Sequence, residues 1–309
     1  MRVTAAPRRR CVSVFIPAYL QRNMLRFGFG AEGSRWLADL PRHIAELERE
    51  WGLRVGPAFD KDGAASWVAP AELRDGCEAV LKITFPHDEA RFEAHALRFL
   101  DRRSTVGLLG ASDDGFSVLL ERCRPGTALW SLGEAERTAL ACRILPRIWR
   151  EPDAGAPFLP LADYVAPWWE DTPRGAAHTG DAVAAAVAQG RTLAAHQPRR
   201  VLLHGDFHPG NVLAAQREPW LVIDPKPLVG DPAYDLAQWL YNCARFVIQA
   251  DDAVAVLRRQ VDRFAVELGL DPARIAGWAL VKALRGDWGP EYLMLFQHVA
   301  QAWEGQRRG

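Results

Sequence analysis

The stretch that decides the fold is VLLHGDFHPGNVLAAQREPWLVIDP, residues 201–225. Short apolar runs at its start, middle and end predict strands, and a polar loop with Asp206 and Asn211 separates the first two. The last apolar run ends at Asp224. Phosphoryl transfer from a nucleotide requires a carboxylate beside the acceptor hydroxyl and oxygen ligands for magnesium. Asp206, Asn211 and Asp224 supply these groups, so the stretch predicts the catalytic centre of a phosphotransferase.

The spacing inside this stretch is typical of kinases. An Asp followed five residues later by an Asn is the catalytic-loop pattern of protein kinases. Here HGD at residues 204–206 replaces the usual His-Arg-Asp, and IDP at residues 223–225 replaces Asp-Phe-Gly. In these two departures, and in LVGDPAYDLA at residues 228–237, the chain resembles the aminoglycoside phosphotransferase family. Within this family, the segment IDPKPLVG at residues 223–230 looks most like the streptomycin 6-phosphotransferase and hydroxyurea kinase branch.

The resemblance implies a two-lobed, protein-kinase-like α+β fold. A small N-terminal lobe would hold an antiparallel sheet and one key helix, and a larger C-terminal lobe would be mostly helical. The expected parts are an N-terminal tail and helical extension, a nucleotide-binding N-lobe, a hinge, and a helical C-lobe with the catalytic loop and acceptor site. Their expected bounds are residues 1–51, 52–120, 121–126 and 127–309.

Two other interpretations of the polar loop need weighing. A single His-Gly-Asp can be an ordinary turn, and His204, Asp206 and His208 at alternate positions could form a metal site of the hydrolase type. The hydrolase interpretation leaves Asn211 and Asp224 without a role, which disfavours it. His204 itself is interpreted as a loop histidine with satisfied hydrogen bonds, rather than as a catalyst.

The composition is that of an ordinary globular protein. The chain has 309 residues, of which 49% are hydrophobic and 25% charged, so it can bury a substantial core. Lys plus Arg is 38 and Asp plus Glu is 38, which leaves no net charge to attract nucleic acid or an anionic membrane. Any charge selectivity toward a partner must therefore be local.

Cysteine usage and the N-terminus both favour a cytoplasmic protein. The cysteines are odd in number and have no paired spacing, so neither a disulfide framework nor a zinc knuckle is predicted; they are Cys11, Cys77, Cys123, Cys142 and Cys243. Basic residues before an apolar run imitate an export signal, but Pro17 interrupts the run and no cleavage site follows. Residues 1–12 are expected to be a tail or an over-long start.

The predicted N-lobe begins after a helix near residues 36–51, whose regular part could start at Asp39-Leu40-Pro41. Apolar runs at residues 53–59, 65–68 and 78–85 predict three strands, with a turn at 60–63. In a kinase-like lobe this turn would cover the phosphates, and its alternative is a plain hairpin turn. Backbone N–H groups and Ser66 are the expected phosphate contacts, and Trp67 is expected to pack.

Lys82 lies between apolar strand residues, so its amine must find an anion at a buried face. The resemblance implies that this anion is the α/β-phosphate, and that Glu93 from a helix at residues 88–100 orients Lys82. The alternative is that the side chains of both residues lie on a solvated surface and bind nothing. The last strands are predicted near residues 105–109 and 116–120. In the hinge that follows, the resemblance places the adenine edge against the backbone of Glu121 and Cys123.

An acidic stretch precedes the catalytic loop. Residues 151–190 hold six acidic side chains and only Arg174 as a base, with Trp168 near the middle. The functional interpretation is a subsite for a cationic, hydroxyl-rich acceptor, formed by Trp168, Glu170 and Asp171. The alternative is a solvated acidic face over a tryptophan that belongs to the core. By resemblance, Asp287 near the last helices is a further acceptor candidate.

The remainder of the C-lobe has helical periodicity. Helices are predicted at residues 135–149, 234–246 and 291–303, and a stripe ending at Gly269 predicts another. Asp271 and Pro272 predict an N-cap and first turn for the helix after it. Asp235, near the start of its helix, is expected to brace the catalytic loop by hydrogen bonds.

The predicted reaction is ATP-dependent phosphorylation of a hydroxyl on a small-molecule antibiotic, with a streptomycin-type aminoglycoside as the first expected acceptor, which would confer resistance. Asp206 would accept the hydroxyl proton, and Asn211 and Asp224 would bind Mg²⁺. Hydroxyurea or another small alcohol is the alternative acceptor. A nucleotide-binding pseudoenzyme acting as an interaction module is the alternative of another class; it would not need Lys82, Asp206, Asn211 and Asp224 together.

Overall fold

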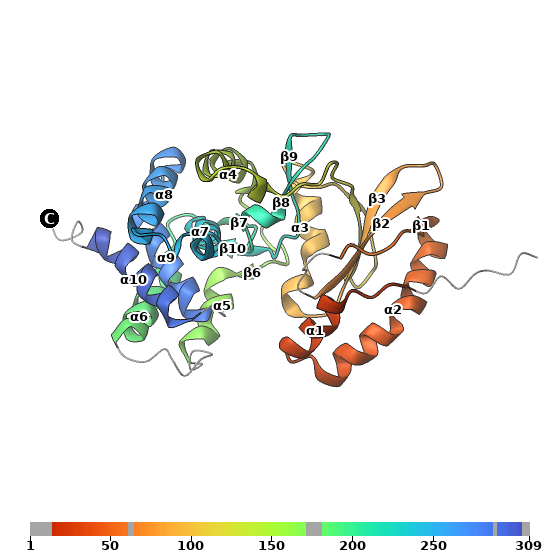
Figure 1. The fold of residues 1–309 in the computed structure, drawn as a ribbon, viewed down its shortest axis with the longest axis horizontal. Helices are drawn as coiled ribbons and strands as arrows, with labels where there is room; N and C mark the ends of the chain where they lie inside the picture. The colour runs from red at the N-terminus through yellow and green to blue at the C-terminus, as the bar shows by residue number, and fades with distance from the viewer. Residues whose placement is uncertain (1–13, 61–64, 171–180, 287–288, 305–309) are drawn as a thin grey trace, which may run out of the picture. The chain divides into compact units, whose positions relative to one another are not determined.

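The computed structural model divides into two compact units (Figure 1). The first unit contains the chain up to Arg91 together with Leu108–Arg122, and the second contains Phe92–Gly107 and the chain from Cys123 onward. The structure describes residues 14–60, 65–170, 181–286 and 289–304.

The first unit is built on a five-stranded sheet. Its spatial order is β1-β2-β3-β5-β4, and every neighbouring pair is antiparallel, as predicted. β2 and β3 form a long hairpin in which Val68 lies opposite Lys82. The strands are β1 Leu53–Val55, β2 Ser66–Leu73, β3 Glu78–Thr84, β4 Leu108–Ala111 and β5 Ser117–Glu121.

Two helices, α1 (Ala18–Arg26) and α2 (Gly30–Trp51), cover one face of this sheet (Figure 1). They share a buried hydrophobic cluster with Trp67 of β2 and with Leu81 and Ile83 of β3. Successive strand residues point to opposite faces, so the alternating position of Lys82 turns it away from this cluster. The prediction that Trp67 packs in the core is confirmed.

The predicted start of the second helix was wrong. α2 begins at Gly30 and runs through Pro41, whereas Asp39-Leu40-Pro41 was expected to start its regular part. Leu40, Ile44 and Leu47 are buried on one stripe, and their burial offsets the roughly 3 kcal/mol that an internal proline costs. The helix ends at Gly52, which has φ +65°, the left-handed conformation common at helix ends.

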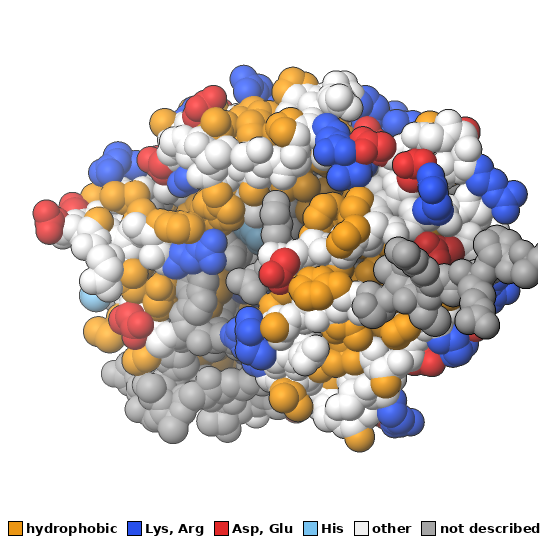
Figure 2. All heavy atoms as spheres, turned by 45° about the vertical axis from the view of Figure 1, so that its right-hand side comes forward, with side chains coloured by type: hydrophobic (Ala, Val, Ile, Leu, Met, Phe, Trp, Pro, Cys, Tyr) orange, Lys and Arg blue, Asp and Glu red, His pale blue; other side chains and the backbone are white. Residues whose placement is uncertain are grey.

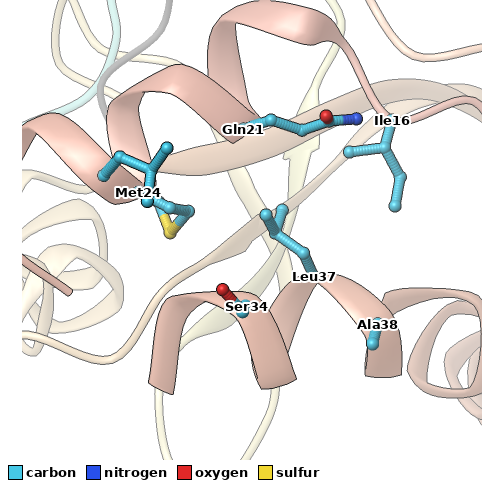
Figure 3. A pocket seen from close by; sticks show the side chains of 7 residues that line it. Ile16, Gln21, Met24, Ser34, Leu37 and Ala38 are labelled. Atoms are coloured by element: carbon cyan, nitrogen blue, oxygen red, sulfur yellow. The ribbon is translucent and has the colours of Figure 1, made fainter. Parts of the chain in front are cut away.

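A small hollow lies between α1 and α2, with Met24 of α1 and Leu37 of α2 on its walls (Figure 3). Its volume is about 320 Å³, and its other lining residues are Ile16, Gln21, Leu25, Ser34 and Ala38. None of the residues predicted to bind nucleotide or acceptor lines it.

The second unit contains two small sheets. β10 lies between β6, to which it is parallel, and β7, to which it is antiparallel, while β8 and β9 form an antiparallel hairpin. Because β10 pairs with β7, the segment before β10 runs beside the polar loop that follows β7. The strands are β6 Leu159–Pro160, β7 Val201–Leu203, β8 Val212–Ala214, β9 Trp220–Val222 and β10 Leu228–Gly230.

Helices form most of the second unit, as predicted. Asp271 caps α9 by accepting a hydrogen bond from the Ala273 N–H at 2.8 Å, so the predicted N-cap is confirmed. The α-helices are α3 Glu93–Leu100, α4 Glu134–Ile148, α5 Leu161–Val165, α6 Asp181–Ala195, α7 Ala233–Val247, α8 Ala253–Leu268, α9 Pro272–Arg285 and α10 Pro290–Glu304. Short 3-10 helices are η1 Asp88–Ala90, η2 Leu129–Ser131, η3 Ala166–Trp169 and η4 Pro209–Asn211.

The segment expected as one helix over residues 88–100 is divided. η1 is followed by α3, which starts only at Glu93. The packing of α3 also differs from the expected lobe boundaries, because α3 belongs to the second unit. Phe99 contacts Phe158, and its backbone carbonyl accepts a hydrogen bond from the Arg150 guanidinium group; both contacts lie in that unit. The assignment of the two units to nucleotide and acceptor binding stays a prediction.

The described surface carries mixed charge. Figure 2 shows Lys and Arg side chains interspersed with Asp and Glu over the visible face, as expected from a net charge of zero. Across the described ranges, no helix combines the length and apolar character needed to cross a membrane.

Candidate active site

The catalytic loop follows β7 and is held by a buried carboxylate. Asp235, in the first turn of α7, accepts hydrogen bonds from the backbone N–H of His204 (3.0 Å) and of Gly205 (2.8 Å). It also accepts one from the indole N–H of Trp149 at 2.9 Å. The prediction that Asp235 braces the loop is therefore confirmed. Burial raises the pKa of Asp235, and His204 and the three N–H donors oppose that rise.

Gly205 meets a steric requirement of the loop. Its φ is +78°, and a Cβ atom here would overlap the carbonyl oxygen of Lys226. The backbones are this close because the Lys226 N–H donates a 2.8 Å hydrogen bond to the His204 carbonyl. Only glycine satisfies both conditions, so the Gly of His-Gly-Asp is needed for packing and conformation.

His204 is fully buried, and both of its ring nitrogens are hydrogen bonded. Nε2 lies 2.9 Å from the Ile223 carbonyl oxygen, and Nδ1 accepts the Asp206 N–H at 3.2 Å. His204 is thus the satisfied loop histidine that was predicted. Metal coordination through either ring nitrogen of His204 would break the hydrogen bond at that nitrogen, and within the described ranges no three His, Cys, Asp or Glu side chains form a metal cluster.

The Asp206 carboxylate is held at both oxygens. Lys226 Nζ donates to Oδ2 at 2.9 Å, and Gln238 Nε2 donates to Oδ1 at 2.6 Å. Burial by itself raises the pKa of Asp206, but the charge and hydrogen bond of Lys226, with smaller effects of His208 and Lys282, hold it well below its usual range. Burial also lowers the pKa of His208, and Lys226 supplies the largest charge effect on Asp206. Asp206 is therefore an ionised carboxylate.

The register of short strands brings Lys226 to Asp206 across 20 residues of sequence. Leu228 of β10 pairs with Leu203 of β7, so the residues before β10 run beside the loop that follows β7. Gln238 arrives from a different element. It lies one helical turn after Asp235 on α7, so one helix face holds both the loop backbone and the catalytic side chain.

Asn211 and the residue before Asp224 are joined by the β8–β9 hairpin. The Ile223 N–H donates to the Asn211 carbonyl at 2.9 Å, and Asn211 Nδ2 donates to the Asp206 carbonyl at 3.0 Å. These bonds use the backbone carbonyl and the side-chain nitrogen of Asn211, and neither uses its side-chain oxygen. Asp224 has φ +58°, a conformation that Asp tolerates better than most residues. Two oxygen-bearing side chains on adjoining strand ends fit the ligand preference of Mg²⁺.

Comparison with known proteins assigns the chain to a family. Residues 54–288 match the model of the family described as aminoglycoside/hydroxyurea antibiotic resistance kinase. The chain belongs to this kinase family. A streptomycin 6-kinase of Streptomyces glaucescens is 36% identical over 281 residues, which cover 88% of this chain and 89% of the relative. A hydroxyurea phosphotransferase of Kitasatospora aureofaciens is also 36% identical, over 90% of this chain and 81% of the relative.

Solved structures show the same kinase-like fold. The choline kinase LicA from Streptococcus pneumoniae has a TM-score of 0.59 and 13% identity, covering 86% of this chain and 99% of LicA. Aminoglycoside phosphotransferase APH(4)-Ia has a TM-score of 0.54 and 18% identity, covering 84% and 96%. The two-lobed kinase-like fold predicted from the sequence is therefore confirmed.

The residues predicted to bind nucleotide in this kinase lie in both units. Lys82 is buried in the middle of β3, on the strand face that does not meet α1 and α2. Ser66 begins β2, and its hydroxyl lies 2.9 Å from that of Thr84. Glu93 is buried at the start of α3 in the second unit. Glu121 ends β5 and Cys123 follows it; part of the turn at residues 60–63 lies outside the described residues.

The predicted acceptor residues are less well supported by their positions. Trp168 is buried in η3, contacts Tyr164, and has its ring centroid 5.9 Å from Lys282 Nζ and 5.7 Å from Arg285 Cζ. Cations of the chain itself therefore surround it, which favours the core interpretation of this tryptophan. Glu170 is exposed. Asp171 and Asp287 lie outside the described residues.

Sequence reasoning missed Lys226 and Gln238 as members of the site. A compositional signal pointed to Lys226, since the 38 basic residues comprise 34 arginines and only four lysines. One of the four is Lys82, another is Lys226, and the charge of a third, Lys282, acts on Asp206. Three of the four lysines are therefore either predicted to bind phosphate or act on Asp206. Gln238 carried no comparable signal, because a helical Gln is common on any surface.

Proposed function

We propose that this chain transfers the γ-phosphoryl group of ATP to a hydroxyl of a streptomycin-type aminoglycoside and so confers resistance. The observation that carries the proposal is the Asp206 carboxylate, held ionised on a His-Gly-Asp loop beside Asn211 and the strand that ends at Asp224. Family membership supports a kinase reaction, and two streptomycin 6-kinases, at 36% and 32% identity, support the acceptor.

Each residue has a defined task in the proposed reaction. Asp206 hydrogen-bonds the acceptor hydroxyl and takes its proton, a contribution of roughly 10²- to 10⁴-fold for general-base catalysis. Lys82 holds the nucleotide phosphates. Asn211 and Asp224 would hold Mg²⁺, which when bound neutralises charge on the phosphates. A binding module without catalysis would need no ionised carboxylate clamped on this loop.

Hydroxyurea is the second candidate acceptor. The hydroxyurea phosphotransferase of Kitasatospora aureofaciens matches this chain at the same 36% identity as the Streptomyces glaucescens streptomycin kinase, over a similar share of the chain. The buried position of Trp168 also weakens the case for an aromatic platform that binds a large cationic acceptor. The two acceptors are therefore tested side by side.

The test is phosphate transfer with ATP and Mg²⁺, followed by mass spectrometry of the acceptor. Streptomycin, other aminoglycosides and hydroxyurea are each offered, with Asp206→Asn as a control that preserves size and removes the charge. The expected result is a mass gain of one phosphate on streptomycin that disappears in the control. Phosphate on hydroxyurea alone would replace the acceptor assignment, and phosphate on none of them would reject antibiotic phosphorylation.

A further inference from the structure

We propose that Lys226 and Gln238 are positioning residues that hold the Asp206 carboxylate in the orientation needed for phosphoryl transfer. The inference rests on the proposed function and extends it to two side chains that do not themselves react. It follows from three independent features of the site: the two hydrogen bonds, an unpaired buried atom on Gln238, and the attachment of Lys226 at both its ends.

The first feature is that each carboxylate oxygen has its own donor. Rotation about the last bond of an aspartate is soft, so one hydrogen bond leaves the carboxylate free to turn. Here Nζ of Lys226 binds Oδ2 and Nε2 of Gln238 binds Oδ1, and the donors come from the segment before β10 and from α7. Two donors on separate elements fix the plane of the carboxylate. The oxygens keep further lone pairs for an acceptor hydroxyl.

The second feature is the state of the Gln238 side chain. It is only 6% exposed, and its Oε1 is buried without a hydrogen-bond partner in the described part of the chain. Turning the amide over would place Oε1 against the Asp206 carboxylate, so the bond to Asp206 fixes its orientation. A buried acceptor without a donor destabilises the fold. An apolar side chain of the same size would avoid that loss, so what the glutamine contributes here is its hydrogen bond to the Asp206 carboxylate.

The third feature is that Lys226 is attached at both ends. Its backbone N–H binds the His204 carbonyl, and its ammonium group binds Asp206 two residues later in the loop. The lysine stem thus spans a fixed distance from the loop backbone to the loop carboxylate. The other charged or titratable side chains that act on Asp206 are His208, whose Nε2 lies 4.0 Å from Oδ1, and Lys282 on α9. Of these groups, Lys226 acts through both its charge and a hydrogen bond.

The experiment compares four variants with the wild type in steady-state kinetics and thermal unfolding. Lys226→Met and Gln238→Met remove one donor each with little change in volume, and Lys226→Arg keeps the charge. Gln260→Met is the matched control, because Gln260 on α8 is also a buried glutamine whose Oε1 has no partner among the described residues. Crystal structures of the wild type and Gln238→Met report the carboxylate orientation independently of activity.

The expected result for Gln238→Met is a loss of kcat without a loss of stability. Misplacing a catalytic group lowers the rate by up to about 10²-fold, so kcat falls about 10- to 100-fold in both Met variants while KM for ATP changes little. Lys226→Arg recovers part of the loss. Gln238→Met and Gln260→Met unfold at the same or a higher temperature than the wild type, and only Gln238→Met loses kcat. In its crystal structure the Asp206 carboxylate is turned.

Three results would overturn the inference. One is an unchanged kcat in both Met variants, and another is a Gln238→Met variant whose stability falls together with its activity, which indicates a structural role. The third is a carboxylate that keeps its orientation in Gln238→Met. A wild type that phosphorylates no acceptor rejects the proposed function instead. In that case the two crystal structures alone decide whether Gln238 positions Asp206.

Discussion

At the residue scale, one glycine of the active-site loop is under two separate constraints. Gly205 combines a positive φ with a position directly against the Lys226 backbone. The two effects can be separated, because Gly269 at the end of α8 has a similar φ of +66° but no atom within 4 Å of the point that a Cβ would occupy. This pair of glycines distinguishes the conformational cost of a side chain from its steric cost.

We predict that Gly205→Ala lowers the free energy of unfolding far more than Gly269→Ala. A left-handed conformation costs an alanine roughly 1–2 kcal/mol, and this cost applies to both variants. The overlap with the Lys226 carbonyl adds to it only at Gly205 and disturbs the loop. Urea unfolding measures both values, and an equal loss in the two variants would contradict the steric argument.

We also predict that two buried thiols resist alkylation in the folded protein. Burial raises the pKa of Cys142 and of Cys243 to about 12, so at pH 8 only roughly one part in 10⁴ of each is thiolate. Of the four cysteines that the structure describes, Cys77 is exposed and reacts first. Iodoacetamide labelling followed by peptide mass spectrometry, with a urea-unfolded control, checks this order. Early labelling of Cys142 or Cys243 would mean that the helical core opens readily.

At the element scale, α7 organises the active site. Asp235 in its first turn holds the loop backbone, and Gln238 one turn later holds the catalytic carboxylate. The helix is itself anchored in the core, where Trp239 stacks on the buried Phe207 of the loop with ring centroids 5.5 Å apart. Because α7 is anchored in this way, its hydrogen bonds also restrain the position of the loop.

We predict that Asp235→Asn destabilises the fold by about 1–3 kcal/mol for each N–H that it leaves unpaired. An amide has one accepting oxygen in place of two, and its NH₂ group faces the His204, Gly205 or Trp149 donors. Asp271→Asn on α9 is the matched control, since Asn caps helices as well as Asp does. Thermal unfolding of both variants decides the point; equal melting temperatures would show that Asp235 is not a brace.

At the scale of the whole molecule, nucleotide binding should be coupled to stability. A ligand that binds only the folded state stabilises it by about 2.7 kcal/mol at 100 times its dissociation constant. We predict this stabilisation for the wild type with ATP and Mg²⁺, and its loss after chelation of Mg²⁺ or in Asp224→Ala. Differential scanning fluorimetry measures the shift, and turnover is assayed in parallel. Wild-type activity in Asp224→Ala would show that Asp224 is not a ligand of Mg²⁺.

Local chemistry in the sequence was sufficient for the antiparallel sheet, most helices and the catalytic loop. Each of these has a signal within a few neighbouring residues: alternation of apolar residues for β2 and β3, an Asp-Pro start for α9, and the Asp206 to Asn211 spacing. The same local signals failed at α2. The helix α2 continues through Pro41 because the free energy gained by burying its apolar stripe against the sheet exceeds the cost of the proline.

The partners of Asp206 were decided by tertiary structure alone. Lys226 and Gln238 are 20 and 32 residues away in the chain, and nothing in their own neighbourhoods indicates which carboxylate they meet. Strand register between β7 and β10 brings in the first, and the packing of α7 brings in the second. The sequence determined which groups can react, because reactivity belongs to a residue type and its spacing. Tertiary packing determined how those groups are oriented and charged, because orientation and charge depend on residues that are distant in the chain.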